Sequence, residues 1–144
     1  MKELNGFWIL DKVGTVLFQY ETFIQGSEDY TALFSNVIVA IQAFVQNLGE
    51  DKVKQMELGK SKVFISRDDE TELILVIKTD KNAKAKKFNK LLEKVQTFLI
   101  QTYIEKVFTK KELIEYIKTS FSNDFSELFK DQKVERLSDF MRGV

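Results

Sequence analysis

The chain has 144 residues and a formal net charge of zero, and it contains no histidine, cysteine or proline. The missing histidine and cysteine exclude Ser-His-Asp and Cys-His catalysis, disulfides and zinc sites built from these residue types. The hydrophobic share of 44% and the charged share of 31% are typical of a soluble globular protein, and the first residues lack the apolar core of a signal peptide. We therefore expect a cytoplasmic protein without a cofactor or metal.

The first elements predicted along the chain are a hairpin and a helix. Apolar runs at 7–10 and 16–18 flank a polar turn in which Gly14 can supply a positive φ. Residues 30–48 then repeat apolar side chains at spacings of three and four, which predicts a helix that stops near Gly49.

Three strands follow, at 53–58, 63–65 and 73–77. The turns between them are short enough for antiparallel hairpins and too short for parallel crossovers. The second and third strands run apolar for several residues in succession, whereas a sheet with one wet face alternates apolar and polar side chains. We therefore expect helices to cover both faces of this sheet.

The end of the chain predicts helices. Residues 83–107 carry an apolar stripe, and Thr109 with Glu112 matches the capping box that begins a second helix at about 110–119. Similar cap spacing precedes a last helix at about 124–142. The order of elements is therefore ββαβββαα, which predicts an α+β fold.

Three patterns imitate functional motifs. The acidic residues among 68–72 could hold a hard cation, but they lack the ligand spacing of a calcium loop and favour a solvated hairpin turn. The tripeptide 59–61 (GKS) resembles the end of a phosphate-binding loop, but the required second glycine is missing and a strand follows. The stretch 31–49 carries no charge, but its four amide side chains argue against a transmembrane segment.

The central helix carries the main candidate interaction surface. Its face away from the core should hold amides and small residues where exposed helices usually carry charge, and interface cores are depleted in charge. The residues of this face that we select are Ser35, Val39, Gln42, Ala43 and Gln46. The alternative is that loops of the same chain cover this face.

The strand after this helix offers a second part of the same surface. If residues 53–58 form an edge strand, their free backbone amides can receive a strand from a partner. The side chains predicted to share one face of it are Val53, Gln55 and Glu57.

Charge is distributed unevenly along the chain. Residues 1–80 carry 8 basic and 13 acidic side chains, and residues 81–144 carry 14 basic and 9 acidic ones. A possible anionic-surface patch lies at a predicted helix start and consists of Lys84, Lys86, Lys87 and Lys90. It lacks interleaved aromatics, so we expect no nucleic acid partner, and an ordinary solvated helix face is the alternative to a peripheral membrane contact.

The order of elements over about residues 5–120 resembles the longin fold and, more distantly, the roadblock fold. Residues 8–17 (WILDKVGTVL) are similar to the first hairpin of those families, in which an aspartate and a glycine sit between apolar strands. The resemblance implies a five-stranded antiparallel sheet with one helix on one face and the C-terminal helices on the other. It also implies a longin-like domain at 1–122 and a C-terminal helical extension at 123–144, packed on or near it.

The resemblance further implies dimers joined along the central helix and third strand, and roles in trafficking complexes and small-GTPase regulation. The leading hypothesis is a non-enzymatic scaffold or regulator that forms a homodimer or a heterodimer with a similar domain. One alternative is a PAS- or profilin-like small-ligand sensor, or an actin-type binding module. A carboxylate-dependent enzyme is a weaker alternative.

Overall fold

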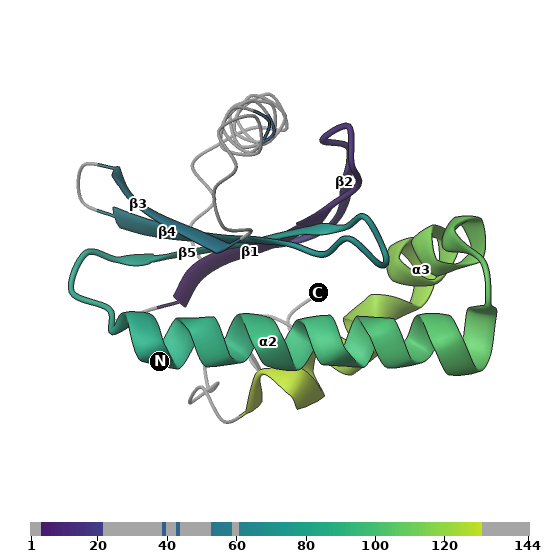
Figure 1. The fold of residues 1–144 in the computed structure, drawn as a ribbon. Coiled ribbons are helices and arrows are strands. Elements are labelled where there is room, and N and C mark those ends of the chain that lie inside the picture. Colours follow the sequence, from purple (N-terminus) through teal and green to yellow (C-terminus); the bar gives the residue numbers. More distant parts are fainter. Residues whose placement is uncertain (1–3, 22–38, 40–42, 44–52, 59–60, 131–144) are drawn as a thin grey trace.

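A computed structural model describes residues 4–21, 39, 43, 53–58 and 61–130 of the chain. Its centre is a five-stranded sheet in which every neighbouring pair is antiparallel. The strand order is β2-β1-β5-β4-β3. The strands are β1 (Leu4–Leu10), β2 (Val16–Glu21), β3 (Val53–Leu58), β4 (Ser61–Arg67) and β5 (Ile74–Asp80). The predicted five-stranded antiparallel sheet is confirmed, and β5 lies at its centre between β1 and β4 (Figure 1).

The first hairpin is built around one carboxylate and one glycine. The Asp11 side chain accepts hydrogen bonds from the backbone amides of Val13 at 3.0 Å and Thr15 at 2.9 Å. Gly14 has φ of 94°, a conformation that side-chain-bearing residues rarely adopt. The turn chemistry predicted for this segment is therefore confirmed.

Two helices lie on one side of the sheet (Figure 1). They are α2 (Ala85–Thr102), which continues into a π-helical turn, η1 (Tyr103–Val107), and α3 (Lys110–Leu128). The N-cap of α3 is Thr109, whose hydroxyl accepts from the Glu112 backbone amide at 3.1 Å. The Glu112 carboxylate accepts from the Thr109 hydroxyl at 3.1 Å rather than from its backbone amide.

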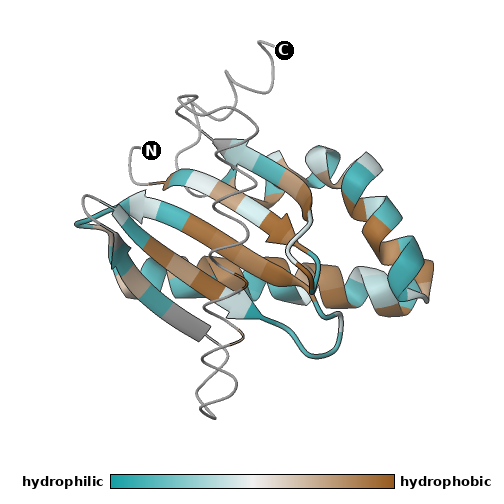
Figure 2. Cartoon of the chain, turned by 90° about the horizontal axis from the view of Figure 1, so that it is seen from above, coloured by the Kyte–Doolittle hydropathy of each residue, from teal (hydrophilic) through white to brown (hydrophobic). Residues whose placement is uncertain are grey.

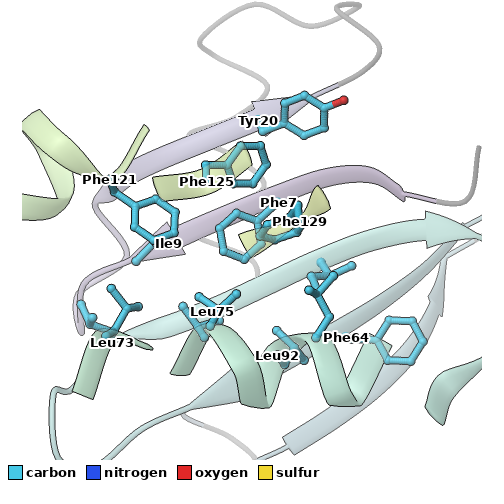
Figure 3. Packing of buried hydrophobic residues seen from close by; sticks show 14 of the residues in the cluster. Phe7, Ile9, Tyr20, Phe64, Leu73, Leu75, Leu92, Phe121, Phe125 and Phe129 are labelled. Atoms are coloured by element: carbon cyan, nitrogen blue, oxygen red, sulfur yellow. The ribbon is translucent and has the colours of Figure 1, made fainter. Parts of the chain in front are cut away.

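The helical side of the sheet buries an aromatic core. The phenylalanine cluster consists of Phe7, Phe18, Phe121, Phe125 and Phe129. The Phe7 ring centroid lies 5.0 Å from that of Phe129 and 5.7 Å from that of Phe125, and Phe18 lies 4.9 Å from Phe121. Figure 3 shows Phe7, Phe125 and Phe129 close together beneath the strands. Through these contacts α3 packs against β1 and β2.

The break predicted between helices at 119–124 is wrong, because α3 runs without interruption to Leu128. The buried residues Leu113, Ile117, Phe121 and Phe125 follow one another at intervals of four and keep one face on the core. Polar groups at the expected break are satisfied along the helix: the Thr119 hydroxyl donates to the Glu115 carbonyl at 2.9 Å.

Further along α3, the Tyr116 hydroxyl donates to the Asp124 carboxylate. Asp124 lies inside α3 and therefore does not begin a new helix. The boundary predicted at 122/123 falls inside α3, and residues 131–144 lie outside the described residues.

The opposite face of the sheet is equally apolar. It buries a second cluster formed by Trp8, Leu10, Val63, Ile65, Ile74 and Val76. Val39, which is helical, packs against this cluster, as does Met56 of β3. Figure 2 looks onto this face and shows hydrophobic residues along the central strands. Both faces of the sheet are therefore buried, as the apolar runs predicted, and of the helix expected on this face only positions 39 and 43 are described.

Gly6 allows the tryptophan of the second cluster to lie flat along its own strand. A Cβ added at Gly6 would stand 2.5 Å from Cη2 of Trp8, a separation that real side chains do not reach. Trp8 is 1% exposed, so the indole has little room to move away.

We predict that Gly6→Ala lowers the free energy of unfolding by about 1–3 kcal/mol, because the added methyl overpacks this face. Urea denaturation followed by circular dichroism measures the change. The matched control is Thr97→Ala, an exposed position on α2, which should stay within about 0.5 kcal/mol of the wild type. An unchanged urea midpoint for Gly6→Ala would contradict the prediction.

Candidate protein-interaction surface

Strand β3 lies at an edge of the sheet. It pairs with β4 along its whole length, from Val53 opposite Ser66 to Leu58 opposite Ser61, and no second strand pairs with it among the described residues. Such an edge presents backbone donors and acceptors in a row that another strand can use. The structure therefore contains the edge strand that the sequence predicted at 53–58.

The side chains of β3 alternate as predicted, with Gln55 and Glu57 on one face and Met56 on the other. Gln55 stands opposite Phe64 in β4, yet Phe64 is fully buried against Phe88 of α2 while Gln55 is exposed. The cover provided by α2 therefore ends between β4 and β3. The Gln55 and Glu57 side chains are therefore exposed on the helix side of β3, and its outer backbone edge has no partner strand among the described residues.

The predicted helix face is described at two positions. Val39 was predicted to point away from the core, but this orientation is wrong, because its half-buried side chain packs against the Trp8 cluster. A valine contributes more by covering that apolar cluster than by facing water. Ala43, also helical, is exposed.

The other members of this face lie outside the described residues, namely Ser35, Gln42 and Gln46. The strand position of Val53 is described, but its side chain is not. The structure thus places Ala43, Gln55 and Glu57 as exposed members of the candidate interaction surface.

The predicted lysine patch lies at the start of α2. Lys84 is the N-cap residue and makes no side-chain cap bond, and the first turn has no acidic residue. Lys84, Lys86 and Lys90 are exposed and form no ion pair within the described part of the chain. Lys87 differs from them, because it is half-buried with its Nζ 5.4 Å from the Phe88 ring centroid.

Two exposed apolar side chains near the end of α2 were not selected from the sequence. Ile104 is 58% exposed and Phe108 is 69% exposed. Phe108 also has φ of 70°, which is unusual for a bulky residue. The exposure of Ile104 could have been predicted from the sequence. This residue follows Lys86 by five helical turns, so it lies on the same face of the helix as Lys86, opposite the buried stripe.

The acidic turn is a structural element. Asp68 is half-buried, and one of its carboxylate oxygens accepts from the Thr71 amide at 2.6 Å and the Thr71 hydroxyl at 2.7 Å. Its other oxygen accepts from the Gln96 side-chain amide at 2.9 Å, which joins the turn to α2. Donors within the chain thus already bind both oxygens of the Asp68 carboxylate.

Glu72, in the same turn, accepts from Lys110 at 3.1 Å and lies 3.9 Å from Lys12. The Lys110 hydrogen bond, together with the charges of Lys110 and Lys12, holds the pKa of Glu72 below its ordinary value. This pair connects the start of α3 to the two turns at that end of the sheet.

A shallow cavity of about 130 Å³ adjoins this ion pair, with Val13, Leu73 and Ile114 in its lining. Small-molecule sites usually enclose about 300–1,000 Å³. The cavity also lies at the turn end of the sheet and not between the sheet and α2. This cavity is therefore not the pocket between sheet and helix that the small-ligand alternative requires.

Two solved structures share the fold. The roadblock/LC7 domain from Streptomyces avermitilis has a TM-score of 0.55 at 14% identity, covering 68% of this chain and 87% of that one. The structure of the mammalian SRP receptor has a TM-score of 0.54 at 17% identity, covering 94% of this chain and 99% of that chain. At these identities the likeness concerns the fold, which is longin-like and related to the roadblock fold.

The gliding protein MglB from Thermus thermophilus has a TM-score of 0.47 at 17% identity, covering 56% of this chain. This chain spans 64% of that protein, less than two thirds of its length. No protein-family model matches the sequence, and no curated protein matches it. Within the described part of the chain, no helix has the length and apolar character needed to cross a bilayer.

We predict that Asp68→Ala lowers the free energy of unfolding by about 2–3 kcal/mol, because it leaves the Thr71 and Gln96 donors without their charged acceptor. Thermal denaturation measures the loss. Glu70→Ala, at an exposed position in the same turn, should change stability by less than about 0.5 kcal/mol. A melting temperature of the wild type that rises on addition of Ca²⁺ would contradict the structural role assigned to this turn.

Proposed function

We propose that this chain is a non-enzymatic interaction domain that pairs with a second domain of the same fold. In that form it acts as a scaffold or regulator of a small GTPase or of a trafficking-type complex. The observation that carries the proposal is that β3 is the edge strand of a longin-like fold, with no strand paired to its outer side among the described residues.

The geometry of β3 supports pairing with another strand. Its outer backbone edge has no partner strand within the described residues, and its exposed side chains Gln55 and Glu57 add no apolar bulk that would block an incoming strand. An extended segment that adds to such an edge gains main-chain hydrogen bonds along the strand. The exposed underside of β3 leaves room for the partner's side chains.

The helical residue Val39 lies on the other face of the sheet from Gln55 and Glu57. Val39 and Met56 pack against the same cluster, so a helical position and the middle of β3 belong to one side of the sheet. Ala43, one helical turn after Val39, is exposed. The longin and roadblock resemblance implies dimers joined along the central helix and the third strand, which are the elements that carry these residues.

A regulatory role for a GTPase or a trafficking complex comes from the resemblance in fold. The chain lacks histidine and cysteine, so its chemistry suits binding through surface complementarity. A scaffold that pairs through β3 keeps the outer faces of α2 and α3 available for a further partner.

The first prediction concerns pairing. The wild type should be dimeric at high micromolar concentration by size-exclusion chromatography with light scattering. Gln55→Lys/Glu57→Lys should be monomeric, because lysines brought together at a strand edge repel a like strand. Both positions are exposed, so circular dichroism should report an unchanged fold.

The matched control for this pair is Asn89→Lys/Glu93→Lys on exposed positions of α2, which makes the same change in charge in the helical layer. The control should remain dimeric. A wild type that stays monomeric, or an edge variant that dimerises as well as the control, would contradict pairing through β3.

The second prediction concerns the GTPase. Immobilised wild-type protein incubated with native lysate should retain a protein that a photo-crosslinkable GTP analogue labels. Excess free domain should compete the labelled protein away, and heat-denatured domain should not retain it. Absence of a competable GTP-labelled protein would count against a GTPase partner while leaving the pairing result untouched.

A further inference from the structure

A second surface lies on the helical layer, away from β3. The outer stripe consists of Lys86, Lys90, Glu93, Thr97, Gln101 and Ile104, all of them exposed. These positions follow the helical repeat along α2 into η1 and extend over roughly 27 Å at 1.5 Å per residue. The opposite stripe of α2, which includes Phe88, Val95 and Leu99, is buried in the core. The outer stripe therefore faces away from the sheet.

The beginning of this stripe is strongly basic. Residues 81–92 contain five lysines and no acidic residue. Lys84, Lys86 and Lys90 are exposed and have no ion pair with the described residues. The positive end of the helix dipole lies at the same place, where it disfavours cations. This concentration of positive charge is unfavourable within the isolated chain, and a negatively charged partner would relieve it.

The chemistry of the patch indicates the kind of anion. All its cations are lysines, which act as hydrated point charges, and it has no arginine to grip a carboxylate or phosphate in a bidentate manner. Phe88 is buried, so no aromatic ring stands among the lysines to stack on a nucleic acid base. Clustered lysines on a helix surface suit the diffuse negative charge of anionic phospholipid headgroups.

Two apolar side chains are exposed at the other end of the stripe. Ile104 is 58% exposed, and Phe108, just beyond η1, is 69% exposed in a left-handed backbone conformation. An exposed phenylalanine in that conformation is costly in two ways, through its hydration and through its backbone. Apolar side chains beside a basic surface can enter the boundary between headgroups and acyl chains.

We propose that the outer stripe, together with Lys84 and Phe108, is a peripheral binding surface for bilayers that contain anionic phospholipids. The lysines lie among the headgroups, and Ile104 and Phe108 enter the interface at the other end. Two signals of different kind, charge and apolar insertion, give firmer membrane binding than either one alone. The residues of this surface are separate from those of β3, and the proposal requires no GTPase.

The test is co-sedimentation of the full chain with vesicles of phosphatidylcholine alone or mixed with phosphatidylserine. The wild type should bind only the mixed vesicles, and high salt should weaken the binding because it screens exposed charges. Lys86→Ala/Lys90→Ala should lower the partition coefficient roughly 25-fold, about fivefold for each lysine. Ile104→Ser/Phe108→Ser should also lower it while leaving the salt dependence in place.

The matched control is Lys111→Ala/Lys118→Ala, which removes the same charge from exposed positions of α3. It should bind close to the wild-type level, and circular dichroism should show that all variants are folded. Equal binding to both vesicle types, or equal losses in the two lysine pairs, would overturn the proposal. Binding to polyglutamate or to soluble inositol hexakisphosphate without binding to the mixed vesicles would overturn it as well.

Discussion

The structure depends on a sheet that is apolar on both faces. In β1, Phe7 and Ile9 point to the helices while Trp8 and Leu10 point the other way, and all four are buried. Because alternate residues of a strand face opposite sides, such a sequence cannot leave either side in water. One layer of helices would satisfy only half of this requirement. The fold therefore has to place other residues against both faces of the sheet.

This constraint also explains which surfaces remain for binding. The inner faces of α2 and α3 are occupied by the aromatic core, and Val39 is drawn onto the second cluster. Among the described residues, what remains exposed is the pair Gln55 and Glu57 on β3, the outer faces of α2 and α3, and the turns. A domain that buries both faces of its sheet binds other molecules through its edges and the outer faces of its helices.

The sequence predicted the features that short segments determine by themselves. Gly14 and Asp11 determine the first turn locally, and Thr109 caps α3 through a hydroxyl three residues from its donor. The apolar runs predicted cover on both faces because strand alternation is a local property. The strand order β2-β1-β5-β4-β3 could not be derived in this way, because it depends on contacts between distant segments.

The errors have a common cause, since each is a local pattern overruled by packing. The polar residues near Thr119 and Asp124 are typical of a helix end, yet Phe121 and Phe125 join the phenylalanine cluster and keep α3 continuous. Val39 was predicted to lie on the outer face of its helix because that face carries amide side chains. In the structure it packs against the apolar cluster around Trp8.

Pairing through β3 would determine how the outer stripes of two copies are oriented relative to each other. If β3 pairs antiparallel with the β3 of a second copy, the twofold axis is perpendicular to the combined sheet. Rotation about this axis leaves the helix-side faces of the two copies on the same side of the sheet. Both α2 helices then lie on the same side of the dimer, with their outer stripes facing the same way. Two linked weak sites facing one surface bind it far more tightly than either site alone, because the second contact forms within one complex. Pairing through β3 would thus turn a modest attraction to anionic lipid into a strong one, so membrane affinity would depend on the dimer and on the concentration of the chain.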